Sequence, residues 1–525
     1  MSKQPNIIIF NPDHMRGDML GHLGNPAAVT PCLDNIVKNE GISFRNAFCQ
    51  NGVCTPSRCS FMSGWYPHVR GHRTMYHMMH EDEPVLLRTL KKAGYYVWWG
   101  GKNDIAPAQY GYQQFCHTRY HGLQAQNNPD EDQWHGAYGH DGYYSMYYGR
   151  IDVKPDNIFT DHDWDIVRTA IRFIRSKPPE PFCLFLALHN PHPPYAVEDP
   201  WYSMIDRTKL PERIKPPEDL HRKSSILGKM FERYGLGRWN EKRWDELRAT
   251  SYGMCSRLDH QLGLLIDALK DEKLYDDSAL FFFSDHGDYL GDYGVVDINQ
   301  NTFEDSLIRV PFIIKPPAGT SVHPGIRNAL VELIDFPATV HDLLNISYSH
   351  TQFGQTLMPL LSRNNDKHRD AVFCEGGRLH GEGHCMELQN PCHENPQSIW
   401  WPRVGLQSSE GPEHTKAVMC RTQDYKFVRR LYEDDELYDL KSDPQECCNL
   451  IKNPDFSNII LKMKDRLLTF LLETSDVVPH TADSRGYEMK ERDLVDYKAK
   501  NFKVVVASIF KHIFFLHPLF FFYLM

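Results

Sequence analysis

The sequence predicts an α/β fold in which helices flank a mainly parallel sheet. Short apolar runs alternate along the chain with stretches of helical periodicity, as they do in successive βαβ units. The apolar runs, residues 6–10 and 279–283 among them, contain no polar alternation, so we expect strands that are covered on both faces. Beyond about residue 365 the pattern changes, which predicts a smaller C-terminal α+β subdomain with an antiparallel sheet.

The individual elements follow from apolar runs, helical periodicity and breaker residues. In chain order we expect a strand at 6–10, a helix near 31–40, a helix and a buried strand over 86–104 separated by Gly94, a helix over 161–178, a strand and proline-rich loop over 182–195, and a helix, strand and polar loop over 258–288. The C-terminal part should hold strands within 371–378 and 416–444 and a helix at 458–473. The predicted domains are 1–365, 366–495 and an apolar terminal extension, 496–525.

Composition and charge exclude some classes of protein. The 525 residues are 41% apolar and 24% charged, as in a soluble globular protein. A net charge of −10 without a Lys/Arg cluster predicts no nucleic-acid partner. The thirteen cysteines include no CxxC pair, which indicates free thiols in a reducing compartment. Because no signal peptide precedes residues 6–10, we expect a cytoplasmic protein.

The C-terminal segment is strongly apolar. Residues 504–525 are nearly long enough to span a bilayer, but they are interrupted by Lys511, His512, His517 and Pro518. A tail anchor stays open, whereas a packed or disordered extension is favoured. We otherwise expect no association with membranes, and the oligomeric state is not predicted.

Polar side chains follow four of the predicted strands. Each comes directly after an apolar run: Asp13, Lys102, His192 and Asp285. Because binding sites of open α/β sheets gather at the carboxyl ends of the strands, these four distant segments should meet in one place.

Cys54 begins a predicted helix in the order C-x-P-S-R, and three roles are open for it. It could be an inert structural thiol. It could be a thiolate nucleophile, since Arg58 and a helix N-terminus both favour the anion. As a metal ligand it lacks companion cysteines.

Residues 52–67, GVCTPSRCSFMSGWYP, resemble the signature of the type I sulfatases, within the alkaline-phosphatase-like superfamily. The resemblance covers most of the chain, in segments 6–18, 30–54, 190–195, 280–288, 303–319 and 424–446. It implies an alkaline-phosphatase-like fold and a maturation enzyme that oxidises Cys54 to Cα-formylglycine. Pro56 and Ser57 belong to the motif which that enzyme reads, and Arg58 would hold the hydrated aldehyde.

The resemblance also implies one divalent metal, for which Ca²⁺ is the first choice while Mg²⁺ and Mn²⁺ stay open. The implied ligands are Asp13, Asp285, His286, the formylglycine oxygen of residue 54, and His14, which stands where the family commonly has a second Asp. Among the implied catalytic residues, Lys102 touches a sulfate oxygen and His192 lies near the leaving oxygen as a general acid. Asp104 stands where the family usually has a histidine.

One departure from the family pattern concerns a second lysine. The family usually has it a few residues before the segment that begins at Phe303, but Ile298 or Asn299 takes that place here. The absence of this lysine leaves three alternatives open: a slower enzyme, a compensating residue such as His14 or a histidine of residues 71–80, or an enzyme that has lost its activity.

The expected function is hydrolysis of a small sulfate monoester, on a mono- or oligosaccharide. The alternatives are a phosphonate or phosphate monoester hydrolase on the same scaffold, and a non-catalytic binder of sulfated glycans. Three segments are candidates for the substrate pocket because they are rich in His, Tyr, Trp and Arg: 70–83, 143–150 and 376–403.

Overall fold

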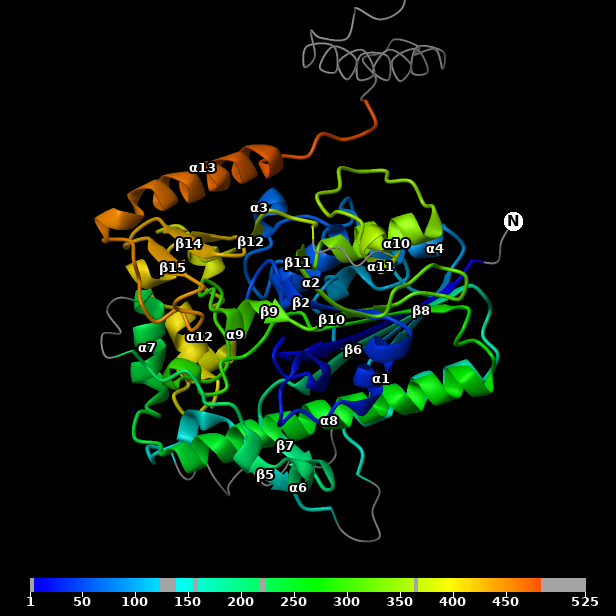
Figure 1. The fold of residues 1–525 in the computed structure, drawn as a ribbon, viewed down its shortest axis with the longest axis horizontal. Coiled ribbons are helices and arrows are strands. Elements are labelled where there is room, and N and C mark those ends of the chain that lie inside the picture. Colours follow the sequence, from blue (N-terminus) through cyan, green and yellow to red (C-terminus); the bar gives the residue numbers. More distant parts are fainter. Residues whose placement is uncertain (1–3, 123–137, 154–158, 218–222, 363–366, 483–525) are drawn as a thin grey trace, which may run out of the picture. The chain divides into compact units, whose positions relative to one another are not determined.

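The computed structural model of this chain describes residues 4–122, 138–153, 159–217, 223–362 and 367–482 (Figure 1). The chain up to Tyr348, together with Gln352–Val477, forms one compact unit, which holds all the elements described below. The predicted extension at 496–525 lies outside the described residues. Within the described ranges, no helix is both long and apolar enough to cross a bilayer.

The main sheet has the predicted, mainly parallel architecture. Its strands lie in the order β11-β2-β10-β8-β1-β6-β3-β4, and β9 pairs with β2. β10 runs antiparallel to both of its neighbours, whereas β1 is parallel to β6 and β8. The strand bounds are β1 Asn6–Asp13, β2 Ile42–Phe48, β3 Tyr96–Gly101, β4 Thr118–Tyr120, β6 Phe182–Pro191, β8 Ser278–Phe283, β9 Arg309–Val310, β10 Phe312–Lys315 and β11 Gly325–Glu332.

Helices cover this sheet on both faces, as the unbroken apolar strands require. Figure 1 shows α1 and α8 on one side of the sheet, and α4, α10 and α11 on the other. A short parallel pair, β5 Tyr147–Ile151 and β7 Tyr195–Glu198, packs against α8. The helix bounds are α1 Pro31–Asn39, α2 Cys54–Ser63, α3 Pro67–Arg70, α4 Leu86–Lys92, α5 His162–Arg175, α6 Trp201–Met204, α7 Ser225–Tyr234, α8 Glu241–Asp271, α9 Asp305–Ile308, α10 Asp335–Leu344 and α11 Met358–Ser362.

The C-terminal part carries the predicted antiparallel sheet. Its strands lie in chain order, β12 Val372–Gly376, β13 Ala417–Arg421, β14 Tyr425–Arg430 and β15 Glu436–Asp439. The helix α13, Ser457–Thr474, covers it, and the rings of Phe373 and Phe470 stack with centroids 3.9 Å apart. A second helix in this part, α12 Trp401–Gln407, was not predicted. The domain limits at 365 and 495 stay predictions.

The helix α8 is longer than the sequence predicts, because it begins at Glu241 and not near residue 258. Asn240 caps it by accepting a hydrogen bond from the Arg243 amide at 3.1 Å. Gly253 lies inside the helix, where a Cβ would come within 2.7 Å of the Trp201 carbonyl oxygen. A glycine that normally weakens a helix therefore marks a close packing contact here.

Candidate active site

The carboxyl ends of four adjacent strands hold the polar residues that the sequence singles out. β8, β1, β6 and β3 are neighbours in the main sheet. The residues that end or follow them are Asp13, Lys102, His192, Asp285 and His286. The Lys102 ammonium lies 2.5 Å from an Asp13 oxygen, so segments 89 residues apart meet in one cluster.

Cys54 is the first residue of α2 and is only 1% exposed. Its sulfur lies 3.2 Å from Lys102 Nζ, 3.2 Å from His286 Nε2 and 3.6 Å from Asp13 Oδ1. Burial first, and then the Asp13 carboxylate, raise the pKa of Cys54 well above its ordinary value. The whole of α2, Cys54–Ser63, is buried. The side chain of Cys54 therefore lies in a closed, polar site that disfavours a thiolate.

Arg58 lies one turn further along α2 and is fully buried. Its guanidinium donates to Asp285 at 2.8 Å, to Asn11 at 2.9 Å and to Asp13 at 3.2 Å. The cation that is hydrogen-bonded to the Cys54 sulfur is Lys102, whereas Arg58 binds the carboxylates of Asp13 and Asp285. Arg58 thus neutralises charge that would otherwise be buried without a partner.

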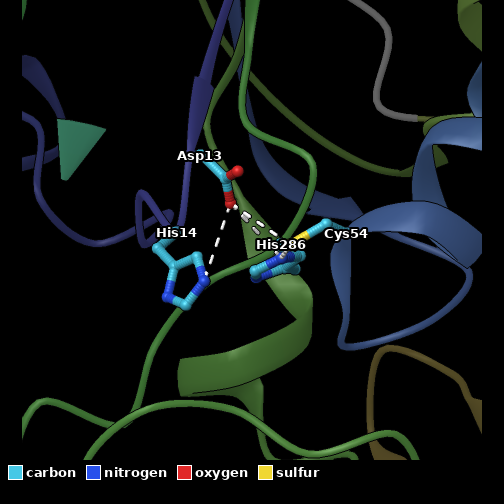
Figure 2. A group of neighbouring side chains, drawn as sticks. All are labelled: Asp13, His14, Cys54 and His286. Atoms are coloured by element: carbon cyan, nitrogen blue, oxygen red, sulfur yellow. Dashed lines mark hydrogen bonds and ion pairs between the residues drawn. The ribbon is translucent and has the colours of Figure 1, made fainter. Parts of the chain in front are cut away.

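Asp13, His14, Cys54 and His286 form a cluster whose potential ligand atoms all lie within 4.8 Å of one another (Figure 2). Asp13 Oδ1 is 3.6 Å from His14 Nε2 and 3.5 Å from His286 Nε2. Adjacent ligands of one ion with bonds near 2.4 Å lie about 3.4 Å apart, so these separations fit a single divalent cation. His14 Nε2 is moreover buried without a hydrogen-bond partner. The donor set therefore suits a metal.

The backbone and a second layer of contacts fix the direction of His14. The residue has φ 67°, a left-handed conformation that is uncommon outside glycine and concentrates at functional sites. Asp288 Oδ2 lies 2.9 Å from His14 Nδ1, and both oxygens of Asp288 accept from the Tyr195 hydroxyl at 2.9 Å. This leaves Nε2 facing Asp13, which is the arrangement of a metal-binding imidazole.

Asp285 lies beside this cluster with its oxygens already engaged. One oxygen accepts from Arg58, and the other accepts from the amides of His286 at 3.0 Å and His14 at 3.4 Å. Burial raises the pKa of Asp285, although Arg58 opposes the rise. Asp285 is not among the four residues of the cluster, although its Oδ2 lies 3.6 Å from His286 Nε2, so its role as a ligand stays a prediction.

Lys102 reaches the cluster from a sharp turn at the end of β3. Gly101 has φ 92°, and a Cβ there would come within 2.0 Å of the Ala187 carbonyl oxygen, so only glycine fits. Asp104, which stands where the family usually has a histidine, lies 3.0 Å from Lys102 Nζ. The ammonium is therefore shared between Asp13, Asp104 and the sulfur.

His192 lies over the cluster in the loop after β6. Its ring is 4.2 Å from that of His14 and 5.4 Å from that of Trp400 between centroids. Nδ1 lies 2.5 Å from the Pro193 carbonyl oxygen, so Nδ1 donates this hydrogen bond and Nε2 does not take part in it. Burial, and next the charge of His14, lower the pKa of His192 well below its ordinary value.

Asp163 holds this loop in place and is absent from the predicted site residues. Its oxygens accept from the amide of His189 at 2.9 Å, from the amide of Asn190 at 2.8 Å and from the Asn190 side chain at 2.5 Å. No motif points to it in the sequence, because an Asp in the first turn of a helix is common.

Replacing Asp163 by Ala should therefore lower both stability and activity. Two amides of the His192 loop would lose their acceptor, at a cost of about 1–3 kcal/mol each. Urea unfolding and aryl-sulfate turnover measure the two effects. As a control, Asp206→Ala removes an exposed carboxylate that accepts from Thr208 and should change neither quantity much. Equal stability of both variants would contradict this role for Asp163.

The positions of the missing lysine are neutral and buried. Ile298 and Asn299 are 2% and 3% exposed. A different cation lies close by, because Arg403 of α12 donates to Asp297 at 3.2 Å. Arg403 ends the candidate pocket segment 376–403, but nothing in the sequence places its guanidinium near the cluster.

Segment 376–403 contacts each of the other two candidate pocket segments. Arg73 pairs with Glu382 at 2.9 Å, and the Met75 amide donates to Glu387 at 2.9 Å. The Tyr144 hydroxyl donates to the Pro396 carbonyl at 2.7 Å. Segments 70–83, 143–150 and 376–403 thus form one continuous wall.

Comparison with known proteins agrees with this geometry. An arylsulfatase of Clostridium perfringens is 25% identical, over 87% of this chain and 92% of its own length. A phosphonate monoester hydrolase of Silicibacter pomeroyi superposes with a TM-score of 0.70 and 20% identity, over 92% and 100% of the two chains. A 2-O GAG sulfatase superposes with a TM-score of 0.68 and 20% identity, over 90% and 93%.

The sulfatase family model matches residues 5–346. This span holds each predicted catalytic and metal-binding residue, from Asp13 to His286, and all strands of the main sheet. The chain therefore belongs to the sulfatase family, whose members are sulfuric ester hydrolases.

Proposed function

We propose that this chain hydrolyses a sulfate monoester with residue 54 as Cα-formylglycine. The environment of Cys54 carries the proposal. An unmodified thiol there is a poor nucleophile, because burial and Asp13 raise the pKa of Cys54 well above its ordinary value. A hydrated aldehyde attacks through oxygen and needs no thiolate. Lys102 Nζ and His286 Nε2 each lie 3.2 Å from the Cys54 sulfur, whose place the oxygen of the aldehyde would take.

The hydrated aldehyde provides two hydroxyls on one carbon. One hydroxyl would attack sulfur and give its proton to the carboxylates of the site, while the bond from sulfur to the alcohol oxygen breaks and protonated His192 gives that oxygen a proton. The other hydroxyl would then give its proton to the neutral His192, so that the bond from carbon to the sulfate oxygen breaks, sulfate departs and the aldehyde reforms. Water then hydrates the aldehyde again. A sulfate group bound next to His192 raises the pKa of the ring by its negative charge, which offsets the lowering by burial. Lys102 and Arg58 balance the charge that builds up on oxygen.

Asp13, His14, His286 and residue 54 would hold one divalent metal, with Asp285 at its edge. Oxygen and imidazole donors suit Ca²⁺ first, and Mg²⁺ or Mn²⁺ as well. When bound, such an ion supplies positive charge against the sulfate oxygens. The buried, unpartnered Nε2 of His14 supports this assignment.

The substrate we propose is a small sulfated saccharide. Aromatic and charged side chains of the continuous wall, Tyr76, Trp400 and Glu387 among them, offer stacking and hydrogen bonds to a sugar. All thirteen cysteines are free thiols, which supports a reducing, cytoplasmic compartment and hence an imported substrate. A separate maturation enzyme would convert Cys54.

A phosphonate monoester hydrolase is the second candidate. The solved enzyme of that activity superposes over 92% of this chain with a TM-score of 0.70. Parallel assays with a phenyl sulfate and a phenyl phosphonate separate the two, and sulfate should give the higher kcat/KM.

Mass spectrometry of the peptide that contains Cys54 tests the proposal directly. Conversion should lower the peptide mass by the difference between a CH₂–SH group and an aldehyde. Peptides with Cys59, in the same helix, are the internal control and should keep the mass of cysteine. Turnover of an aryl sulfate by protein that carries only unmodified Cys54 would refute the formylglycine mechanism. A fully converted protein that binds a sulfated sugar without turnover would be a non-catalytic binder.

A further inference from the structure

The two cations of the predicted catalytic set have most of their donors occupied. Arg58 donates to Asp285, Asn11 and Asp13 from all three of its nitrogens. Lys102 lies within 3.0 Å of both Asp13 and Asp104. These carboxylates cancel much of the positive charge that an anionic sulfate ester would meet. A further donor that is not already paired would therefore matter for binding.

Arg403 has such a donor. Its guanidinium is anchored by one ion pair, from Nε to Asp297 Oδ2 at 3.2 Å, and Asp297 in turn accepts from the Tyr234 hydroxyl at 3.0 Å. The side chain is 13% exposed, and Nη1 is buried without a hydrogen-bond partner. A buried guanidinium nitrogen without a partner is costly in the free protein, and an incoming anion would satisfy it.

Two sets of contacts place Arg403 beside the cluster. Trp400, one turn before it, has its ring 5.4 Å from that of His192. On the other side, the Asp297 amide lies 3.4 Å from the Tyr195 hydroxyl, which also donates to Asp288, the partner of His14. The guanidinium is thus joined to the candidate metal site through a short buried network.

From this placement we infer that Arg403 binds the sulfate group of the substrate through Nη1, as a catalytic residue contributed by the C-terminal part of the chain. The inference rests on the proposed function and extends it, because it assigns the positive charge that Ile298 and Asn299 cannot supply. Asp297 positions the guanidinium, and the sulfate replaces the missing hydrogen-bond acceptor.

The electrostatics of the site agree with this assignment. Burial lowers the pKa of Arg403, but Asp297 and Glu387 outweigh burial and raise it, so the guanidinium stays charged and can bind an anion.

Two variants of Arg403 test the inference. Arg403→Ala should lower kcat/KM for an aryl sulfate by about a hundredfold, the usual loss for one preorganised donor. Arg403→Lys keeps a positive charge but loses the guanidinium fork, so it should recover only part of that loss. Binding of inorganic sulfate, measured by calorimetry on the metal-loaded enzyme, should weaken in Arg403→Ala and be partly restored in Arg403→Lys.

Arg233 provides the matched control, since its guanidinium packs on Trp401 of the same helix with 4.4 Å between its carbon and the ring. Arg233→Ala should leave sulfate binding unchanged. If sulfate binding were lost in both variants, Arg403 would only stabilise α12, and the inference would be overturned. Unchanged sulfate binding in Arg403→Ala would overturn it too. Sulfate binding is measured without turnover, so failure of the proposed function would appear separately, as a wild type that binds sulfate but cleaves no ester.

Discussion

Cys54→Ala should abolish sulfate-ester hydrolysis while the protein stays folded. Alanine cannot be converted to the aldehyde, and the site then has no atom to accept the sulfate group. We expect kcat to fall by about 10⁴-fold or more, as it does when a nucleophile is removed from other hydrolases. The loss of stability should be no more than about 1–2 kcal/mol, because a single small side chain is shortened. Turnover of an aryl sulfate and urea unfolding measure the two quantities.

Cys59→Ala is the control for this variant. Cys59 lies in the same helix and is also 1% exposed, so the two substitutions remove similar buried sulfur atoms. Cys59→Ala should therefore lose comparable stability and keep its activity. If Cys54→Ala kept turnover near that of the wild type, residue 54 would not be the nucleophile.

Asp13→Asn should remove the metal and the activity together. Burial alone would raise the pKa of Asp13, but Lys102 and Arg58 lower it well below its ordinary value, so this carboxylate is always charged. Asparagine takes away that charge and leaves both cations with a weaker partner. Activity should fall by more than the roughly 100-fold typical of a residue outside the coordination shell.

Elemental analysis of the purified variant, together with its turnover, tests this prediction. Asp292→Asn is the control, because Asp292 is a buried carboxylate that is not part of the cluster and pairs with Arg16 at 2.7 Å. It should keep its metal. Full metal occupancy in Asp13→Asn would show that Asp13 is not a ligand.

The fold could be predicted from the sequence where strands are unbroken apolar runs and helices have clear periodicity. The strand at 6–10 and the helices near 31–40 and 161–178 appear as β1, α1 and α5. The first half of α8 was missed because Thr250, Ser251 and Gly253 are poor helix formers, and tertiary packing overrides their preference.

The site was partly predictable for a different reason. Residues that follow adjacent parallel strands must converge, so Asp13, Lys102 and His192 could be grouped before any coordinates were known. Arg403 could not, because its position depends on how the unpredicted helix α12 packs against α7 and the turn at 391–394. Asp163 was missed because its function is to accept hydrogen bonds from a loop, which leaves no pattern in the sequence.

The burial of α2 determines at which stage of folding Cys54 could be modified. Every residue of the C-x-P-S-R motif, Cys54–Arg58, is enclosed once the sheet and helices have closed over it. If Cys54 is converted as proposed, a maturation enzyme that binds this motif could reach it only before α2 is enclosed. Folding and oxidation would then compete in time, and a molecule that folded first would keep its thiol. The fraction of active enzyme in a preparation would then depend on the rate of folding relative to the rate of modification.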